Sequence, residues 1–189
     1  MSDDAELYME MQDPYFWDWV EEYNHHSYDD DDYYDDDDVE YKYNCLFNRV
    51  HKKKNLAVFI DAENISSSHA GKINGQIQRI GELFEARYYA MQKDNSTSSW
   101  KQEAKKYGFK PILMSGSPEK NKIDNKIIKD AKKMLEQNKQ VDIFCIVSRD
   151  GDFTSLVKYL REHKKRVVIL ATKQTSKRLK DASSEVKGI

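Results

Sequence analysis

Two carboxylates follow the most apolar stretch of the chain. The run from Ile143 to Val147 is continuous and rich in β-branched residues, and Asp150 and Asp152 come shortly after it, on either side of Gly151. Such a run is typical of a strand that is buried on both faces of a parallel sheet. Because open α/β sheets bind their ligands at the carboxyl ends of the strands, chemistry is expected at these acids.

The Asp-Gly-Asp sequence also has a purely structural explanation, since these residues are common in solvated turns. We expect Asp152 to cap the helix predicted over residues 153–162. Capping requires only one acid. Asp150 therefore remains a candidate ligand for a cation, which would need more oxygen ligands from other parts of the chain.

Two other segments supply such ligands. The apolar run over residues 56–60 predicts a second buried strand, which ends at Asp61 and is followed by Asn64. Asp124 lies at the start of a helix predicted over residues 122–137. Each acid has a simpler explanation when taken alone, because Asp61 can form a strand-end turn and Asp124 can cap its helix.

The strand order decides whether these acids meet. In the order 3-2-1-4-5, the strands that precede Asp61 and Asp150 are neighbours, and ligands bind where the order reverses between them. Asp152 lies beside Asp150, and Asp124 can overhang the same edge. Carboxylates gathered without a compensating base repel one another, so a divalent cation is expected among them. Oxygen ligands favour Mg²⁺ or Mn²⁺ over zinc.

A cation held by carboxylates in a basic domain indicates phosphate chemistry. The metal can lower the pKa of a water molecule and neutralise charge on the transition state and the leaving oxygen. Lys122 and the hydroxyl of Ser148 are candidates to hold the substrate phosphate, although Lys122 can equally be a surface lysine. For Asp130 we expect an exposed helical residue, because a spacing of six residues turns it away from Asp124.

The rest of the folded part alternates helical and strand patterns. The predicted strands cover residues 56–60, 86–91, 110–114, 143–147 and 166–171, and the predicted helices cover 72–84, 96–107, 122–137, 153–162 and 175–183. This alternation predicts an α/β fold with a five-stranded, mainly parallel sheet and right-handed crossovers.

Charge is distributed unevenly along the chain. Residues 1–40 hold 17 of the 33 acidic residues and no Lys or Arg, whereas the remainder holds 31 basic and 16 acidic residues. The basic part suggests a polyanionic partner such as nucleic acid.

The acidic arm, residues 1–44, is predicted to be disordered, with a short helix near residues 14–23 that begins at Asp13-Pro14. The arm is either a solubilising tail or a segment that docks on a protein partner or on its own basic domain. Aromatic residues interleaved with carboxylates could imitate stacked bases and phosphates in the latter case. The adjacent His25 and His26 are expected to have no specific role.

Cys45 and Cys145 are the only cysteines, so a disulfide scaffold is not expected. No stretch reaches the roughly 18 apolar residues of a membrane span, and the acidic start does not resemble a signal peptide. A cytoplasmic protein, or a nuclear one, is expected. The sequence leaves the oligomeric state open, a homodimer included.

Three motifs together carry a family resemblance: Phe59-Ile-Asp-Ala-Glu-Asn64, Lys122-Ile-Asp124 with Asp130 six residues later, and Ser148-Arg-Asp-Gly-Asp-Phe153. In this order and spacing, over residues 55–185, they resemble the NYN domain, the LabA-like branch of the PIN-domain ribonucleases. The resemblance implies a PIN-like three-layer sandwich with helices on both faces of the sheet. It also implies metal-dependent endoribonuclease activity, with single-stranded RNA as the expected substrate.

By position, the resemblance gives metal-binding or catalytic roles to Asp61, Asp124, Asp150 and Asp152, and it makes Asn64 the residue that positions the first acid or its water. Arg149 stands where the family often has a small residue, and the acidic arm has no counterpart in the family pattern.

Two other functions compete with a ribonuclease. A non-catalytic RNA-binding or protein-scaffolding module could keep the same fold and use its basic face. A phosphatase or nucleotide hydrolase is disfavoured, because the chain has no P-loop motif and no second aspartate two residues after Asp61.

Overall fold

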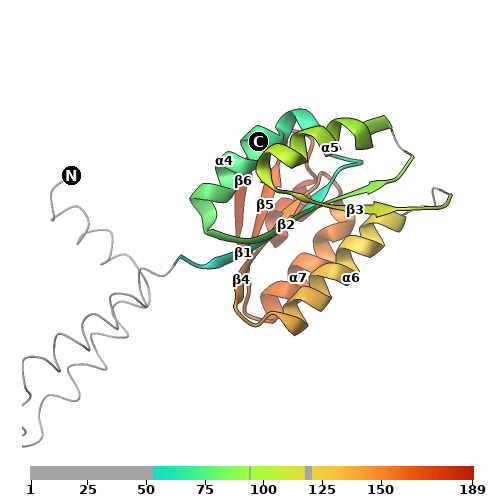
Figure 1. Cartoon of the computed structure of the whole chain (residues 1–189). Coiled ribbons are helices and arrows are strands. Elements are labelled where there is room, and N and C mark those ends of the chain that lie inside the picture. The colour runs from blue at the N-terminus through green and yellow to red at the C-terminus, as the bar shows by residue number, and fades with distance from the viewer. Residues whose placement is uncertain (1–52, 94, 118–120) are drawn as a thin grey trace, which may run out of the picture. The chain divides into compact units, whose positions relative to one another are not determined.

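A computed structural model describes residues 53–93, 95–117 and 121–189 (Figure 1). The acidic arm, with its predicted helix near residues 14–23 and with His25 and His26, lies outside the described residues.

The described part of the chain is built on one parallel sheet in the order β3-β2-β1-β4-β5-β6. Its strands are β1 (Asn55–Asp61), β2 (Glu82–Met91), β3 (Lys110–Met114), β4 (Val141–Val147), β5 (Arg166–Ala171) and β6 (Glu185–Gly188). The predicted α/β class and the order of the first five strands are confirmed. The prediction of five strands is wrong by one. The missing strand, β6, is a short edge strand with one large apolar residue, Val186, which gives almost no apolar signal.

Helices cover both faces of the sheet, as Figure 1 shows for α4 and α5 on one side and α6 and α7 on the other. The α-helices are α4 (Ala70–Ile80), α5 (Asn95–Tyr107), α6 (Lys122–Gln137), α7 (Thr154–Glu162) and α8 (Lys177–Ala182), and the 3₁₀ turns are η1 (Ser67–His69) and η2 (Gly151–Phe153). No helix in the described residues combines the length and the apolar character needed to cross a membrane.

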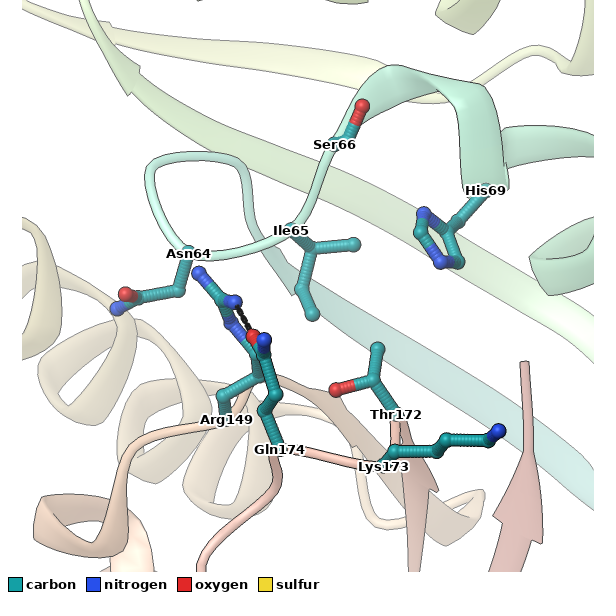
Figure 2. A pocket seen from close by; sticks show the side chains of 8 residues that line it. All are labelled: Asn64, Ile65, Ser66, His69, Arg149, Thr172, Lys173 and Gln174. Carbon is teal, nitrogen blue, oxygen red and sulfur yellow. Dashed lines mark hydrogen bonds between the residues drawn. The ribbon is translucent and has the colours of Figure 1, made fainter.

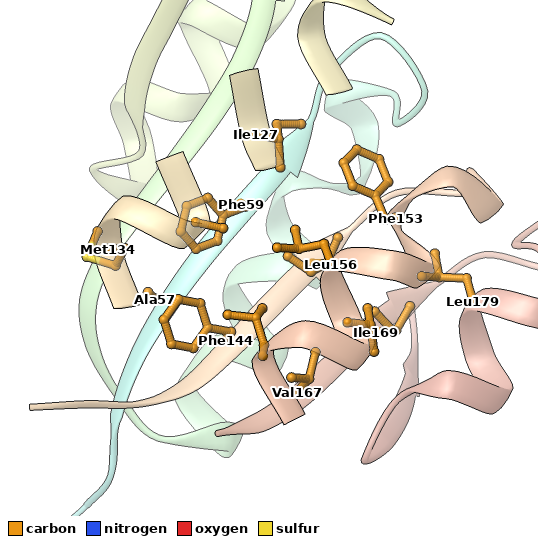
Figure 3. Packing of buried hydrophobic residues seen from close by; sticks show 14 of the residues in the cluster. Ala57, Phe59, Ile127, Met134, Phe144, Phe153, Leu156, Val167, Ile169 and Leu179 are labelled. Carbon is orange, nitrogen blue, oxygen red and sulfur yellow. The ribbon is translucent and has the colours of Figure 1, made fainter. Parts of the chain in front are cut away.

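The central strands are apolar on both faces because both faces are covered. On β1, Phe59 joins the core beneath α6 and α7, while Val58 joins the core beneath α4 and α5. Figure 3 shows the first of these cores, where Phe59 and Phe144 of the neighbouring β4 stack with ring centroids 6.1 Å apart. This double burial makes β1 and β4 the rigid centre of the domain.

The end of α4 differs from the prediction. We expected a helix over residues 72–84, but α4 ends at Ile80, and Leu83 and Phe84 belong to β2, where each is more than a third exposed. The cause is a contact with the strand below. A Cβ on Gly81 would lie 2.4 Å from the carbonyl oxygen of Lys54, and the next amide donates to that oxygen. The helix therefore stops where the chain must approach β1 closely.

We predict that Phe144→Ala lowers the free energy of unfolding by about 3–5 kcal/mol, because it removes a fully buried ring and leaves a cavity. Chemical denaturation of the two proteins measures the difference. Phe84→Ala is the matched control, since the same truncation at a ring that is 39% exposed removes much less buried contact. Equal losses for the two variants would contradict the assignment of Phe144 to the core.

Candidate active site

Asp61 is the buried centre of the site. It is the last residue of β1, is 1% exposed, and lies where the strand order reverses between β1 and β4. Its Oδ2 accepts hydrogen bonds of 2.7 Å from both Ser148 Oγ and Asn64 Nδ2, and its Oδ1 accepts one of 3.2 Å from the Asn64 backbone N–H. These donors supply the hydrogen bonds that a buried carboxylate needs.

Ser148 joins the ends of the two central strands. It follows β4, is fully buried, and accepts a hydrogen bond of 3.1 Å from the backbone N–H of Asp150 while it donates to Asp61. We had considered its hydroxyl as a contact for the substrate phosphate. The geometry does not support that contact, because the hydroxyl is buried and engaged by two groups of the protein.

The capping role that we predicted for Asp152 belongs to the other acid after β4. Asp150, and not Asp152, is the cap: its Oδ1 accepts a hydrogen bond of 2.9 Å from the Asp152 backbone N–H at the start of η2. The 3₁₀ turn η2 leads directly into α7, so the helical part begins at Gly151 and the residue before it is Asp150. The Asp152 side chain is 54% exposed, and its Oδ1 lies 3.6 Å from Nη2 of Arg178.

Gly151 lies between these acids in close contact with side chains from the segment that begins α8. A Cβ at this position would lie 2.9 Å from Ser176 Oγ and 3.2 Å from Arg178 Nη2. The same Nη2 donates a hydrogen bond of 2.9 Å to the Gly151 carbonyl. Arg178 thus holds the acid-bearing turn from α8, a role that we did not predict because nothing in its local sequence distinguishes it from other surface arginines.

Asp124 reaches the same edge from the first turn of α6. Burial raises the pKa of Asp124 most, and the negative charges of Asp61, Asp150, Asp152 and Glu63 add to it, so that the pKa is about 6. The structure therefore brings the four predicted acids into one electrostatic field. Glu63 is a fifth member of this field, which we missed although it lies inside the first motif.

The two other predicted site residues flank these acids. Asn64 contacts Asp61 directly, which matches a residue that positions the acid. Lys122 lies two residues before Asp124 at the start of α6, and its Nζ donates a hydrogen bond of 3.3 Å to the Ser117 carbonyl.

The donor set consists of oxygens, which suits a hard cation. Within residues 53–189, gaps aside, no three His, Cys, Asp or Glu side chains converge closely enough to enclose a metal ion by themselves. Mg²⁺ commonly keeps several waters and takes only one or two protein carboxylates together with substrate oxygens. The site therefore fits a hydrated Mg²⁺ or Mn²⁺ and does not provide the closed cage of a structural zinc.

Asp130 is not the exposed helical residue that we predicted. It is 7% exposed, accepts hydrogen bonds of 2.7 Å from Lys126 and 3.2 Å from Tyr89, and lies 3.9 Å from Arg87. Burial and the nearby Asp130 carboxylate raise the pKa of Tyr89. These contacts fasten α6 to β2, so Asp130 supports the helix that carries Asp124.

Two hollows border the acids at the same edge. One, of about 320 Å³, is lined by Asn64, Ile65, Ser66, His69, Arg149, Thr172, Lys173 and Gln174. The other, of about 380 Å³, is lined by Glu63, Met91, Gln92, Lys93, Met114, Ser115 and Gly116. The first hollow lies beyond the ends of β1, β4 and β5, and the second lies at the ends of β2 and β3. An extended ligand therefore has room on both sides of Asp61.

Comparison with known proteins agrees with this architecture. The NYN domain model matches residues 55–187. A crystal structure of a protein of unknown function from Vibrio parahaemolyticus superposes with a TM-score of 0.63 at 22% sequence identity, covering 74% of this chain and 94% of that one. At this identity the similarity shows the fold alone. No curated protein matches the sequence.

The fold and the acids at its switch point define a PIN-like α/β domain. The chain belongs to the NYN domain family, as the sequence motifs suggested.

We predict that Ser148→Ala lowers the free energy of unfolding by about 1.5–3 kcal/mol, because it removes a hydrogen bond to a buried carboxylate. Thermal or chemical unfolding measures the loss. Ser155→Ala, which truncates an exposed serine at the start of α7, is the control and should change stability by less than about 0.5 kcal/mol. A Ser148→Ala protein as stable as this control would show that the hydroxyl does not hold Asp61.

Proposed function

We propose that this chain is a metal-dependent endoribonuclease that hydrolyses phosphodiester bonds in single-stranded RNA. The observation that carries the proposal is that acids from separate segments lie near the point where the strand order reverses. Their charges contribute to the raised pKa of Asp124. At Asp124, burial and the charges of the neighbouring acids both oppose ionisation, and a bound cation would relieve both. Membership in a family with a PIN-like fold supports the same chemistry.

The acids would share the work of holding the cation: Asp61, Asp124, Asp150 and Asp152. When bound, Mg²⁺ or Mn²⁺ would activate a water molecule and neutralise charge on the phosphoryl group. Asn64 and Ser148 keep Asp61 in one orientation, and Asp150 is held by its capping bond. Lys122, two residues before Asp124 on α6, would attract a substrate phosphate.

Charge on the folded part favours a polyanionic substrate. Residues 53–189 carry 28 basic against 16 acidic side chains. A net positive surface raises the local concentration of RNA and speeds its association. The negative charge of the acid group is thus confined to one edge of a basic domain, where a cation would mediate contact with phosphate.

We predict that Asp150→Asn reduces RNA cleavage at least about 100-fold, because the neutral amide lacks the negative charge with which a carboxylate holds a divalent cation. Asn is also a good cap, so the turn at η2 should keep its structure. The measurement is cleavage of labelled RNA and DNA in Mg²⁺ or Mn²⁺, compared with a chelator.

Asp142→Asn is the matched control for this substitution. Asp142 accepts a hydrogen bond of 3.0 Å from the Asn55 backbone N–H at the opposite edge of the sheet, and its amide analogue can still accept that bond. Cleavage by Asp142→Asn should equal that of the parent protein. Salt-sensitive RNA binding with no turnover in added Mn²⁺ would instead support the alternative, a non-catalytic RNA-binding or scaffolding module.

The acidic arm is proposed to restrain the basic domain, either alone or with a protein partner. We predict that deletion of residues 1–44 raises the affinity for RNA, because 17 acidic side chains compete with phosphates for the same basic groups. Titration of labelled RNA with the full and shortened chains at two salt concentrations measures the effect. Equal affinities at low salt would identify the arm as a solubilising tail.

Location and assembly stay as predicted from the sequence. We propose a cytoplasmic protein, or a nuclear one, as the sequence predicts. Homodimer formation is left to direct measurement.

A further inference from the structure

The hollow beside Asn64, which we call the Arg149 pocket, shares a wall with the acid group (Figure 2). Asn64 lines the pocket and also donates to Asp61 through its side chain. Arg149 lies between Ser148 and Asp150, the two residues that shape the acid-bearing turn. A ligand in this pocket would therefore lie directly next to the acids.

The pocket wall suits a flat and partly apolar group. Seven of its eight lining residues are polar and Ile65 is 2% exposed, but the surface that these residues present to the pocket is mostly carbon. Its volume of about 320 Å³ lies at the lower end of the range for small-molecule sites. A phosphate alone would not exploit an apolar wall, whereas a nucleobase would.

Planar polar groups stand at the pocket in a defined orientation. Arg149 Nη1 donates a hydrogen bond to Gln174 Oε1, and Figure 2 shows the guanidinium between Asn64 and Gln174. The backbone of Arg149 is fixed as well, since its carbonyl accepts a bond of 3.0 Å from the Ser176 N–H. Guanidinium planes stack on unpaired bases, and their edges bond to polar groups.

We propose that the Arg149 pocket receives one base of a single-stranded RNA, at the nucleotide next to the phosphate that lies over the acids. Arg149, oriented by Gln174, stacks on that base and contacts its edge. Lys173 at the pocket attracts the phosphate of the same nucleotide. The cleavage of the neighbouring bond rests on the proposed nuclease function, but the recognition of the base does not.

Binding without turnover tests this pocket. Full-length protein in chelator is titrated with a labelled single-stranded RNA of about ten nucleotides, within the site sizes of single-strand binders. Arg149→Ala should weaken binding about tenfold, which corresponds to about 1.4 kcal/mol. Arg149→Lys keeps the charge but loses the plane, and should restore little of the affinity. Gln174→Ala, at an exposed residue, should weaken binding less but in the same direction.

Arg79→Ala is the matched control. Arg79 is exposed in the last turn of α4, close to the opposite edge of the sheet where Gly81 meets Lys54. Its loss should leave RNA binding unchanged while removing the same charge. Thermal unfolding of each variant verifies that the fold is retained, and the exposed Gln174→Ala variant carries the test if Arg149→Ala is unstable.

A series of the same RNA with one abasic position in each member separates base from phosphate. At one position, loss of the base should weaken binding to the parent protein as much as Arg149→Ala weakens binding to the intact RNA. With that abasic RNA, the Arg149→Ala protein and the parent protein should bind equally well.

Two results would overturn the base pocket and leave a purely electrostatic contact: full affinity of the Arg149→Lys protein, or the same weakening by Arg149→Ala on every abasic RNA. A protein that fails to cleave RNA but passes this test would refute the nuclease and keep the pocket.

Discussion

The buried carboxylate of Asp61 is the constraint on which the site depends. A charged group at 1% exposure is tolerated only where donors are supplied, and here they come from Asn64 in the following turn and from Ser148 at the end of the adjacent strand. Ser148 can reach Asp61 only because β1 and β4 are parallel neighbours, with Ile60 paired to Val147. The strand order is therefore a requirement of the site as well as of the core.

This arrangement also explains how a basic domain can carry an acidic centre. Asp61 is held from within the protein, whereas Asp124 on α6 and Asp150 before η2 lie near enough for their charges to interact. The fastenings of those elements lie outside the acid group: Asp130 attaches α6 to β2, and Arg178 attaches the turn at Gly151. Arg178 also lies 3.6 Å from the exposed Asp152, so the bases mainly hold the supports and pair with the acids only at the outer end of the group.

The sequence predicted the features that depend on local pattern. The strands β4 and β5 were recognisable because burial on both faces gives a continuous apolar run. The helix α6 was recognisable because burial on one face places apolar residues every three or four positions. Features that depend on contacts between distant segments were missed or misassigned. Leu83 and Phe84 continue a helical pattern, yet Lys54 approaches Gly81 and ends the helix. Asp150 rather than Asp152 is the cap because of where η2 begins. Asp130 is buried because Tyr89 of β2 lies beside it. The spacing of residues in the sequence reveals neither position.

One loop connects the core, the acids and the neighbouring pocket. The fully buried indole of Trp100 on α5 donates a hydrogen bond of 2.9 Å to the Ile65 carbonyl and stacks on Tyr88 of β2. Ile65 follows Asn64 and lines the Arg149 pocket, so Trp100 fixes from below both the residue that orients Asp61 and the wall of the pocket. The wall of the pocket and the residue that orients Asp61 are consequently fixed by the same packing, so a change at Trp100 is expected to disturb both.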